Sequence, residues 1–284
     1  MLKYRLVVGA VMSIIFAGLM LLDDHLQRTV TAVNLPKATV LTVFTVILVI
    51  LAQFEFGKLA RSAGHDVFLA ITTPACILLA IGQYLSQIIE INISLYYEGV
   101  LTAAILALFL VQARLHSTKA TMANCGTSML AIGYLGVLAL WIPAIGIGFG
   151  PWAVLMFVFT VKSSDIGAYA AGRLFGKHKF SPNISPKKTW EGLCGAGILA
   201  GVVGYVFGVG SGIIKPVYGM IFGVIFAYIG QLGDLAESML KRDAQMKDSS
   251  AAVPGFGGIL DVIDSPLVAA PLAWTFFEIV KRWG

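Results

Sequence analysis

Two aspartates near the C-terminus of this 284-residue chain have a spacing suited to binding a cation. Asp261 and Asp264 are three residues apart, so on a helix their carboxylates point the same way. Magnesium in proteins binds one or two carboxylates and completes its shell with waters and substrate phosphates. We therefore expect a magnesium site that serves phosphoryl or nucleotidyl transfer. The alternative is that these aspartates only form structural ion pairs with Lys241 and Arg242.

A second polar stretch, residues 231–242, directly follows a long apolar segment. Four of its functional groups recur at helical spacing and share one face: Asp234, Glu237, Ser238 and Lys241. The stretch therefore presents carboxylates and a cation together.

Asp165 interrupts another apolar segment, where an ionisable side chain is costly. It should therefore face a cavity or a charged partner. Lys162, three residues earlier, lies on the same helical face and could be that partner. The alternative is a structural ion pair at the end of a helix.

The segment after Asp165 is basic and patterned. Its five basic residues are Arg173, Lys177, Lys179, Lys187 and Lys188. We expect Ser185 to cap a helix with Pro186 at its first position, which leaves free N–H groups for a phosphate. Together these features suit an anionic, phosphorylated ligand. The simpler alternative is a cluster that only holds anionic lipid head groups.

These polar stretches stand out because the rest of the chain is apolar. Apolar residues make up 58% of the sequence and charged residues 12%, and the mean hydropathy is +0.86. Ordinary soluble domains carry about 25% charged residues, so we expect an all-α polytopic integral membrane protein. Collagen, disordered, coiled-coil and disulfide-scaffold classes are excluded by the same composition. The net charge of +5 is small for a nucleic-acid-binding protein, so we expect no nucleic-acid partner.

About nine segments are long and apolar enough for transmembrane helices, which need about 20 residues each. They are residues 6–22, 38–54, 67–89, 94–112, 126–148, 151–172, 193–213, 217–232 and 265–280. Most of the 20 Lys and Arg residues fall on one side when the N-terminus is placed in the cytoplasm. We expect a multi-pass protein of the inner (plasma) membrane with a cytoplasmic N-terminus. Its two long polar segments, 162–192 and 233–264, then lie on the cytoplasmic face.

The chain divides near residue 150. We expect N-terminal transmembrane helices over residues 1–150 and a catalytic transmembrane region over residues 151–284. The charged residues of the first half are interpreted as interfacial anchors. Small residues at Gly197/Gly201 and Gly204/Gly208/Gly212 allow close helix contact, either within the chain or across a homodimer.

The C-terminal polar segments resemble a known signature. Ser238-Met-Leu-Lys241-Arg242, Lys247-Asp248 and Pro254-Gly-Phe-Gly-Gly-Ile-Leu-Asp261-Val-Ile-Asp264 closely resemble the C-terminal motif of the phosphatidate cytidylyltransferases, the CDP-diacylglycerol synthases. Ser185-Pro-Lys-Lys-Thr-Trp-Glu-Gly192 and Ser164-Asp165-x-x-Ala-Tyr169 also look like segments of that family. The resemblance covers residues 151–284. Phe256 and Val262 depart from it, because the family motif usually has His and Arg there.

The resemblance implies that CTP and phosphatidic acid react to give CDP-diacylglycerol and pyrophosphate, a step of phospholipid biosynthesis, at a cytoplasmic-face site in a bilayer protein. It also implies magnesium, often with a monovalent cation such as K⁺. The metal ligands expected on this basis are Asp165, Asp234, Asp261 and Asp264. The expected catalytic residues are Lys241, Arg242, Asp248 and Asp261. The expected substrate-binding residues are Tyr169, Ser185, Lys187, Lys188, Ser238 and Lys247.

Two other functions remain compatible with the sequence. A polyprenol kinase, or a cytidylyltransferase for another lipid, would use similar residues. A non-catalytic lipid-binding or transport protein is the third reading, and only Phe256 and Val262 support it. Transporters place polar residues near the bilayer midplane, often in inverted repeats, and this sequence has no such repeat.

Overall fold

The computed structural model describes residues 2–29, 35–250, 252, 253, 255 and 257–283, with side chains from residue 7 onward. Within these ranges the regular elements are helices, and the β pairing consists of two isolated bridges, Lys179–Thr189 and Val253–Gly257. The expected all-α membrane fold is therefore confirmed. Phe256, one of the two departures from the signature, lies outside the described residues.

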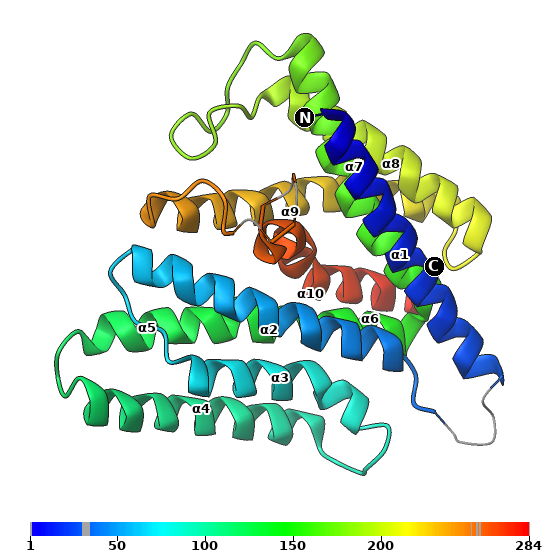
Figure 1. The fold of residues 1–284 in the computed structure, drawn as a ribbon. Coiled ribbons are helices and arrows are strands. Elements are labelled where there is room, and N and C mark those ends of the chain that lie inside the picture. The colour runs from blue at the N-terminus through cyan, green and yellow to red at the C-terminus, as the bar shows by residue number, and fades with distance from the viewer. Residues whose placement is uncertain (1, 30–34, 251, 254, 256, 284) are drawn as a thin grey trace. The chain divides into compact units, whose positions relative to one another are not determined.

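The connections between the helices are mostly short (Figure 1). The helices are α1 (Leu2–Thr29), α2 (Thr39–Ser62), α3 (Leu69–Leu85), α4 (Ile93–Leu115), α5 (Thr121–Ile132), a π-helical turn (Gly133–Val137), α6 (Trp141–Phe149), α7 (Pro151–Phe175), α8 (Trp190–Ser211), α9 (Pro216–Asp243) and α10 (Ile259–Trp283). The connections between α7 and α8 and between α9 and α10 are long. Eight helical segments of the described chain are long and apolar enough to cross a membrane. Each of the nine expected segments has a helical counterpart, but α3, with 17 residues, is shorter than the other eight.

The chain folds as two compact units. The first comprises residues 1–148 and 243–262, and the second comprises residues 149–242 and 263–284. The first unit therefore includes the segment between α9 and α10 and the first four residues of α10.

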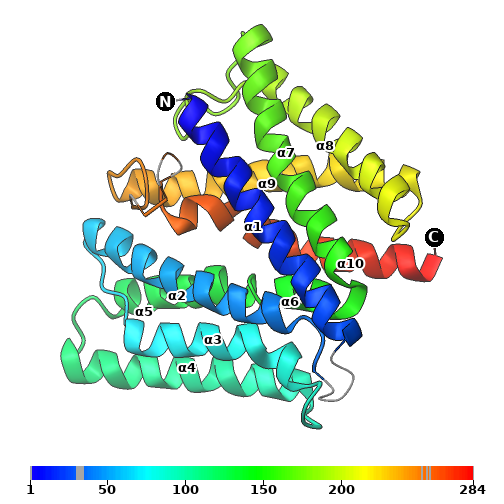
Figure 2. The ribbon, with the colours of Figure 1, turned by 45° about the vertical axis from the view of Figure 1, so that its right-hand side comes forward.

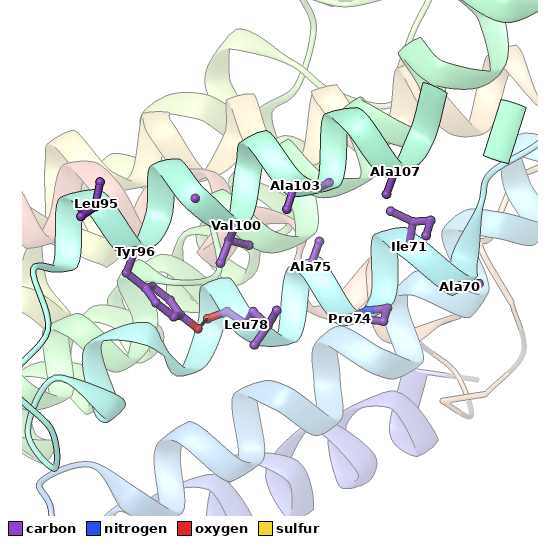
Figure 3. A pocket seen from close by; sticks show the side chains of 12 residues that line it. Ala70, Ile71, Pro74, Ala75, Leu78, Leu95, Tyr96, Val100, Ala103 and Ala107 are labelled. Atoms are coloured by element: carbon purple, nitrogen blue, oxygen red, sulfur yellow. Dashed lines mark hydrogen bonds between the residues drawn. The ribbon is translucent and has the colours of Figure 1, made fainter. Parts of the chain in front are cut away.

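In the first unit, α3 packs against α2, α4 and α5 (Figures 1 and 2). A buried polar contact ties three of these helices together, because Gln53 of α2 donates to Cys76 Sγ of α3 (2.8 Å) and to the Ala131 carbonyl of α5 (3.4 Å). Between α3 and α4 lies a groove of about 510 Å³, lined by small and apolar residues (Figure 3). Tyr96 lies toward one end of it and donates to the Leu78 carbonyl (3.0 Å). The groove has no acidic or basic lining residue, so it offers no group for phosphate chemistry.

In the second unit, small residues bring the helices close. A Cβ on Gly167 of α7 would lie 2.4 Å from the Gly195 carbonyl of α8, and one on Gly204 of α8 would lie 2.1 Å from the Gly219 carbonyl of α9. Gly204 therefore makes a close helix contact within one chain, whereas Gly212 has open space around it. Both views show α7 and α8 side by side (Figures 1 and 2).

Two helices differ in extent from the expected segments. α9 continues past Leu232 to Asp243, so the polar stretch is helical, as its spacing predicts. α10 begins at Ile259 rather than at Ser265, with Pro266 and Pro271 inside it. Asp261 and Asp264 therefore both lie in the first turns of α10.

Candidate functional site

Lys162 on α7 lies between two carboxylates of the second unit. Its Nζ is 3.7 Å from Asp165 Oδ2 on the same helix and 3.5 Å from Asp264 Oδ1 on α10. The predicted pairing of Lys162 with Asp165 is confirmed, and Asp264 is a second partner that the sequence analysis did not name. Asp264 is buried and also accepts from its neighbour, the Ser265 backbone N–H (2.6 Å).

Lys188, at the end of the basic segment, reaches α9. Its ammonium group forms an ion pair with Asp234 and donates to the Gln231 carbonyl (3.2 Å). The side chain of Gln231 in turn donates to Asp165 (2.9 Å). Asp165 and Asp234 are thus linked through one buried glutamine and one lysine.

Three carboxylates of the second unit converge. Asp234, Glu237 and Asp264 each offer an oxygen, and these atoms lie within 4.8 Å of one another. A Cβ on Gly233 would lie 2.9 Å from the Ser265 Cα, so the glycine allows α9 and α10 to approach closely at this point. The close approach is what brings two carboxylates of α9 beside one of α10.

Glu237 was not among the expected ligands, although its spacing from Asp234 placed it on the same face. It is fully buried, and one of its oxygens is 2.5 Å from Lys241 Nζ. We call the following residues the charged cluster: Lys162, Asp165, Lys188, Asp234, Glu237, Lys241 and Asp264. Four carboxylates and three ammonium groups leave it one negative charge in excess. Such a set suits a hard divalent cation, which prefers oxygen ligands.

The structure gives Asp264 a partner other than the expected Lys241 and Arg242. Asp264 pairs with Lys162, and Lys241 pairs with Glu237. The exposed Arg242 donates instead to the Ile184 carbonyl (3.3 Å).

The expected helix cap at Ser185 is wrong. α8 begins at Trp190, and its cap is Thr189, whose hydroxyl accepts from the Gly192 N–H (3.1 Å). Ser185 and Pro186 lie in a turn that the Lys188 N–H closes onto the Ser185 carbonyl (3.1 Å). The turn takes up the Lys188 N–H, one of the backbone groups that a helix at Pro186 would have left free.

The remaining expected site residues of the second unit lie outside the charged cluster. Tyr169 is exposed and accepts from Arg173 (3.0 Å). Lys187 is exposed, whereas Ser185 and Ser238 are half-buried. Of the residues expected to bind substrate, Lys188 alone is part of the charged cluster as defined above.

Asp261 belongs to the first unit, where its carboxylate contacts Ser249 and Gly258 of the signature segment. It accepts from the Ser249 N–H (2.9 Å), the Ser249 hydroxyl (2.7 Å) and the Gly258 N–H (2.7 Å). The nearby Lys247 and Asp248 are exposed, and Val262 is half-buried. The three converging carboxylates described above do not include Asp261.

Two acidic residues of the first unit were misread from the sequence: Asp23, with 2% of its surface exposed, and Glu55. Glu55 of α2 is buried, with 5% of its surface exposed, and is therefore no interfacial anchor. Its carboxylate accepts from Ser249, Ser250, Ile259 and Leu260. The signal in the sequence was a single acidic residue between Phe54 and Phe56, which needs buried partners to be tolerated.

About half of this chain is similar to curated proteins that share one name. Part of this chain is similar to "Phosphatidate cytidylyltransferase" of Mycobacterium bovis, with 37% identity over 156 residues that cover 50% of this chain and 49% of that protein. The Haemophilus influenzae protein of the same name is 43% identical over 135 residues, covering 45% and 46%. The Helicobacter pylori protein is 36% identical over 135 residues, covering 48% and 50%. The chain thus spans about half the length of the curated relatives it matches.

A broader match covers almost the whole chain. The sequence profile of the Cytidylyltransferase family matches residues 4–280, which include most of both units and every residue of the charged cluster. The expected family resemblance is therefore confirmed, and the chain belongs to the Cytidylyltransferase family.

Proposed function

We propose that the protein condenses CTP with phosphatidic acid to give CDP-diacylglycerol and pyrophosphate, and that the charged cluster takes part in this reaction. The observation that carries the proposal is the convergence of Asp234, Glu237 and Asp264 beside Lys162, Lys188 and Lys241. Anionic substrates need cations, and a bound cation needs carboxylates. The cluster supplies both, and the names of the relatives supply the substrate class.

The carboxylates fit a magnesium ion. Their oxygens lie close enough together to share one ion, and all are hard ligands. Asp234 and Asp264 would hold it, with Glu237 or Asp165 as a further ligand. When bound, the ion neutralises phosphate charge and polarises the phosphorus that is attacked. A monovalent cation such as K⁺ would occupy a neighbouring position.

The reaction requires no covalent intermediate with the protein. A phosphate oxygen of phosphatidic acid attacks the α-phosphorus of CTP, a new P–O bond forms, and the bond to pyrophosphate breaks. The attacking phosphate is already ionised near neutral pH, since its second pKa is about 6, so it needs no strong base. The task of the protein is alignment and charge neutralisation.

The lysines of the cluster have distinct roles in this proposal. Lys188 is carried by the segment between α7 and α8, so it can exchange Asp234 for a substrate phosphate. The exposed Lys187 and Arg242 add charge for the approach of CTP. Lys162 balances the charges of Asp165 and Asp264 and reduces the repulsion between their carboxylates.

The apolar helices fit a lipid substrate. The acyl chains would stay in the bilayer while the phosphate reaches the cluster. We propose that the cluster faces the cytoplasm, where CTP is made, and that the N-terminus lies on the same side of the inner membrane. The distribution of Lys and Arg supports this orientation.

Release of pyrophosphate from CTP tests the proposal. Purified protein in lipid bilayers should release it only when phosphatidic acid and magnesium are both present. Asp264→Asn should lower the rate by at least about 100-fold, because a neutral amide is a poor magnesium ligand. Asp243→Asn is the matched control, since Asp243 is exposed at the end of α9.

Three results would count against the proposal. Folded wild-type protein that releases no pyrophosphate would refute it. Near-normal turnover by Asp264→Asn would remove Asp264 from the site. A phosphorylated polyprenol as product, when a polyprenol replaces phosphatidic acid, would identify a kinase instead.

A further inference from the structure

Glu55 is a buried carboxylate of the first unit with several hydrogen-bond donors, and the proposed chemistry does not use it. It lies within α2, yet its contacts are with residues far along the chain. One oxygen accepts from the Ser250 hydroxyl (2.6 Å) and the Ile259 N–H (3.0 Å). The other accepts from the Ser249 hydroxyl (3.0 Å) and the Leu260 N–H (2.8 Å). A carboxylate that lies within hydrogen-bond distance of four such donors is held in one position.

These contacts replace the missing cap of α10. A helix leaves its first N–H groups without partners, and a preceding Ser, Thr, Asp or Asn usually accepts from one of them. The residues directly before Ile259 are Gly257 and Gly258, which have no side chain to do so. Glu55 supplies the acceptor from another helix, and its negative charge is favourable at the positive end of α10.

Ser249, which contacts Glu55, also contacts Asp261. The Ser249 hydroxyl lies within hydrogen-bond distance of both Glu55 (3.0 Å) and Asp261 (2.7 Å), but it has only one proton to donate. A Cβ on Gly258 would lie 2.0 Å from the Ser249 hydroxyl oxygen and 2.3 Å from a Glu55 oxygen. The glycines of the signature therefore make room for two carboxylates around one serine.

We propose that Glu55 is a positioning residue for the nucleotidyl transfer. It holds the signature segment, from Ser249 to Leu260, and thereby fixes Asp261 and the first turn of α10. Asp264 follows one turn later on the same helix, so the point at which α10 begins sets the rotation of that carboxylate. This inference rests on the proposed function, and it extends the functional machinery to a residue of the N-terminal half.

The kinetic test compares Glu55→Gln with Glu98→Gln, which removes an exposed carboxylate from α4. Glutamine keeps the shape but loses the charge and turns a donor toward the N–H groups. We expect kcat to fall about 10- to 100-fold, which corresponds to the loss of about one hydrogen bond to a charged group. The magnesium concentration at half-maximal rate should rise about tenfold. A smaller folded fraction would not move that concentration. The control should behave as wild type.

Ser249→Ala provides the second arm. If Glu55 acts through the shared hydroxyl, the effects of Glu55→Gln and Ser249→Ala on kcat should overlap, so that the double variant is little worse than Glu55→Gln. Multiplicative effects would overturn the proposal. Should Glu55→Gln fail to fold, Glu55→Asp takes its place, because it keeps the charge and shortens the reach.

A third experiment detects the contacts of Glu55 without measuring turnover. Hydrogen–deuterium exchange is measured on the intact protein in bilayers without magnesium. In Glu55→Gln, exchange should quicken at the Ser249, Ile259 and Leu260 amides and remain unchanged in α2. Unchanged exchange at these amides, or a magnesium dependence within twofold of wild type, would refute the role of Glu55. A wild-type protein without turnover would instead refute the proposed function, and the exchange result would still show whether Glu55 holds the segment.

Discussion

Replacing Lys162 by methionine tests the charge balance of the cluster. Methionine is similar in length and has no charge, so the variant leaves Asp165 and Asp264 without their shared cation. At separations of 3.5 and 3.7 Å, each attraction amounts to about 4.5–4.7 kcal/mol at an effective dielectric constant of about 20. Because 32% of the lysine side chain is exposed, screening and desolvation offset most of this. We expect a net loss of about 1–3 kcal/mol of stability without magnesium.

Magnesium should reverse part of this loss. The cluster carries a charge of −1 in the wild type (three lysines, four carboxylates) and −2 in Lys162→Met. A more negative cluster binds a divalent cation more tightly. A tenfold gain in affinity adds about 1.4 kcal/mol at saturating magnesium. At about 2–4 °C per kcal/mol, the magnesium-induced rise in Tm should exceed that of the wild type by about 3–6 °C.

Thermal unfolding in bilayers, with EDTA or with magnesium, measures both effects. Lys215→Met is the matched control, because Lys215 is exposed in the same unit and lies 5.9 Å from the Tyr218 ring. Its magnesium-induced shift should equal that of the wild type. A shift in Lys162→Met that is equal to or smaller than the wild-type shift would refute the placement of the cation among these carboxylates.

Three further predictions follow from the second unit. Lys188→Met should raise the KM for CTP about tenfold or more, because an ammonium group that can contact phosphate is lost; an unchanged KM in steady-state assays would exclude that role. Gly223→Ala should destabilise the protein by about 1–3 kcal/mol, since its Cβ would lie 2.1 Å from a carbonyl of α8. Gly210 has open space around it, so Gly210→Ala should be neutral or stabilising. Thermal unfolding measures both effects. Thr189→Ala should lower the unfolding free energy by about 1 kcal/mol through loss of the α8 cap. Ser185→Ala should lower the unfolding free energy by less than Thr189→Ala does. A larger loss in Ser185→Ala would instead support the helix cap predicted from the sequence.

The sequence predicts the membrane helices well, because length and apolarity are local properties of a segment. It also predicts which residues of α9 share a face, since helical spacing is local too. It does not predict the start of α8, because Ser185 and Thr189 both precede acceptable helix-forming residues. The turn closed by the Lys188 N–H decides between them.

The sequence by itself determined that this chain is a helical membrane protein with carboxylates and lysines gathered in its C-terminal half. Its signature residues were sufficient to indicate the family. Only the tertiary structure decided which charges meet, because Lys162 and Asp264, or Lys188 and Asp234, are separated by tens of residues and are joined by helix packing. The same holds for Glu55, whose four donors lie about 200 residues later in the chain. A buried carboxylate is stable only where donors surround it, and folding brings those donors to it.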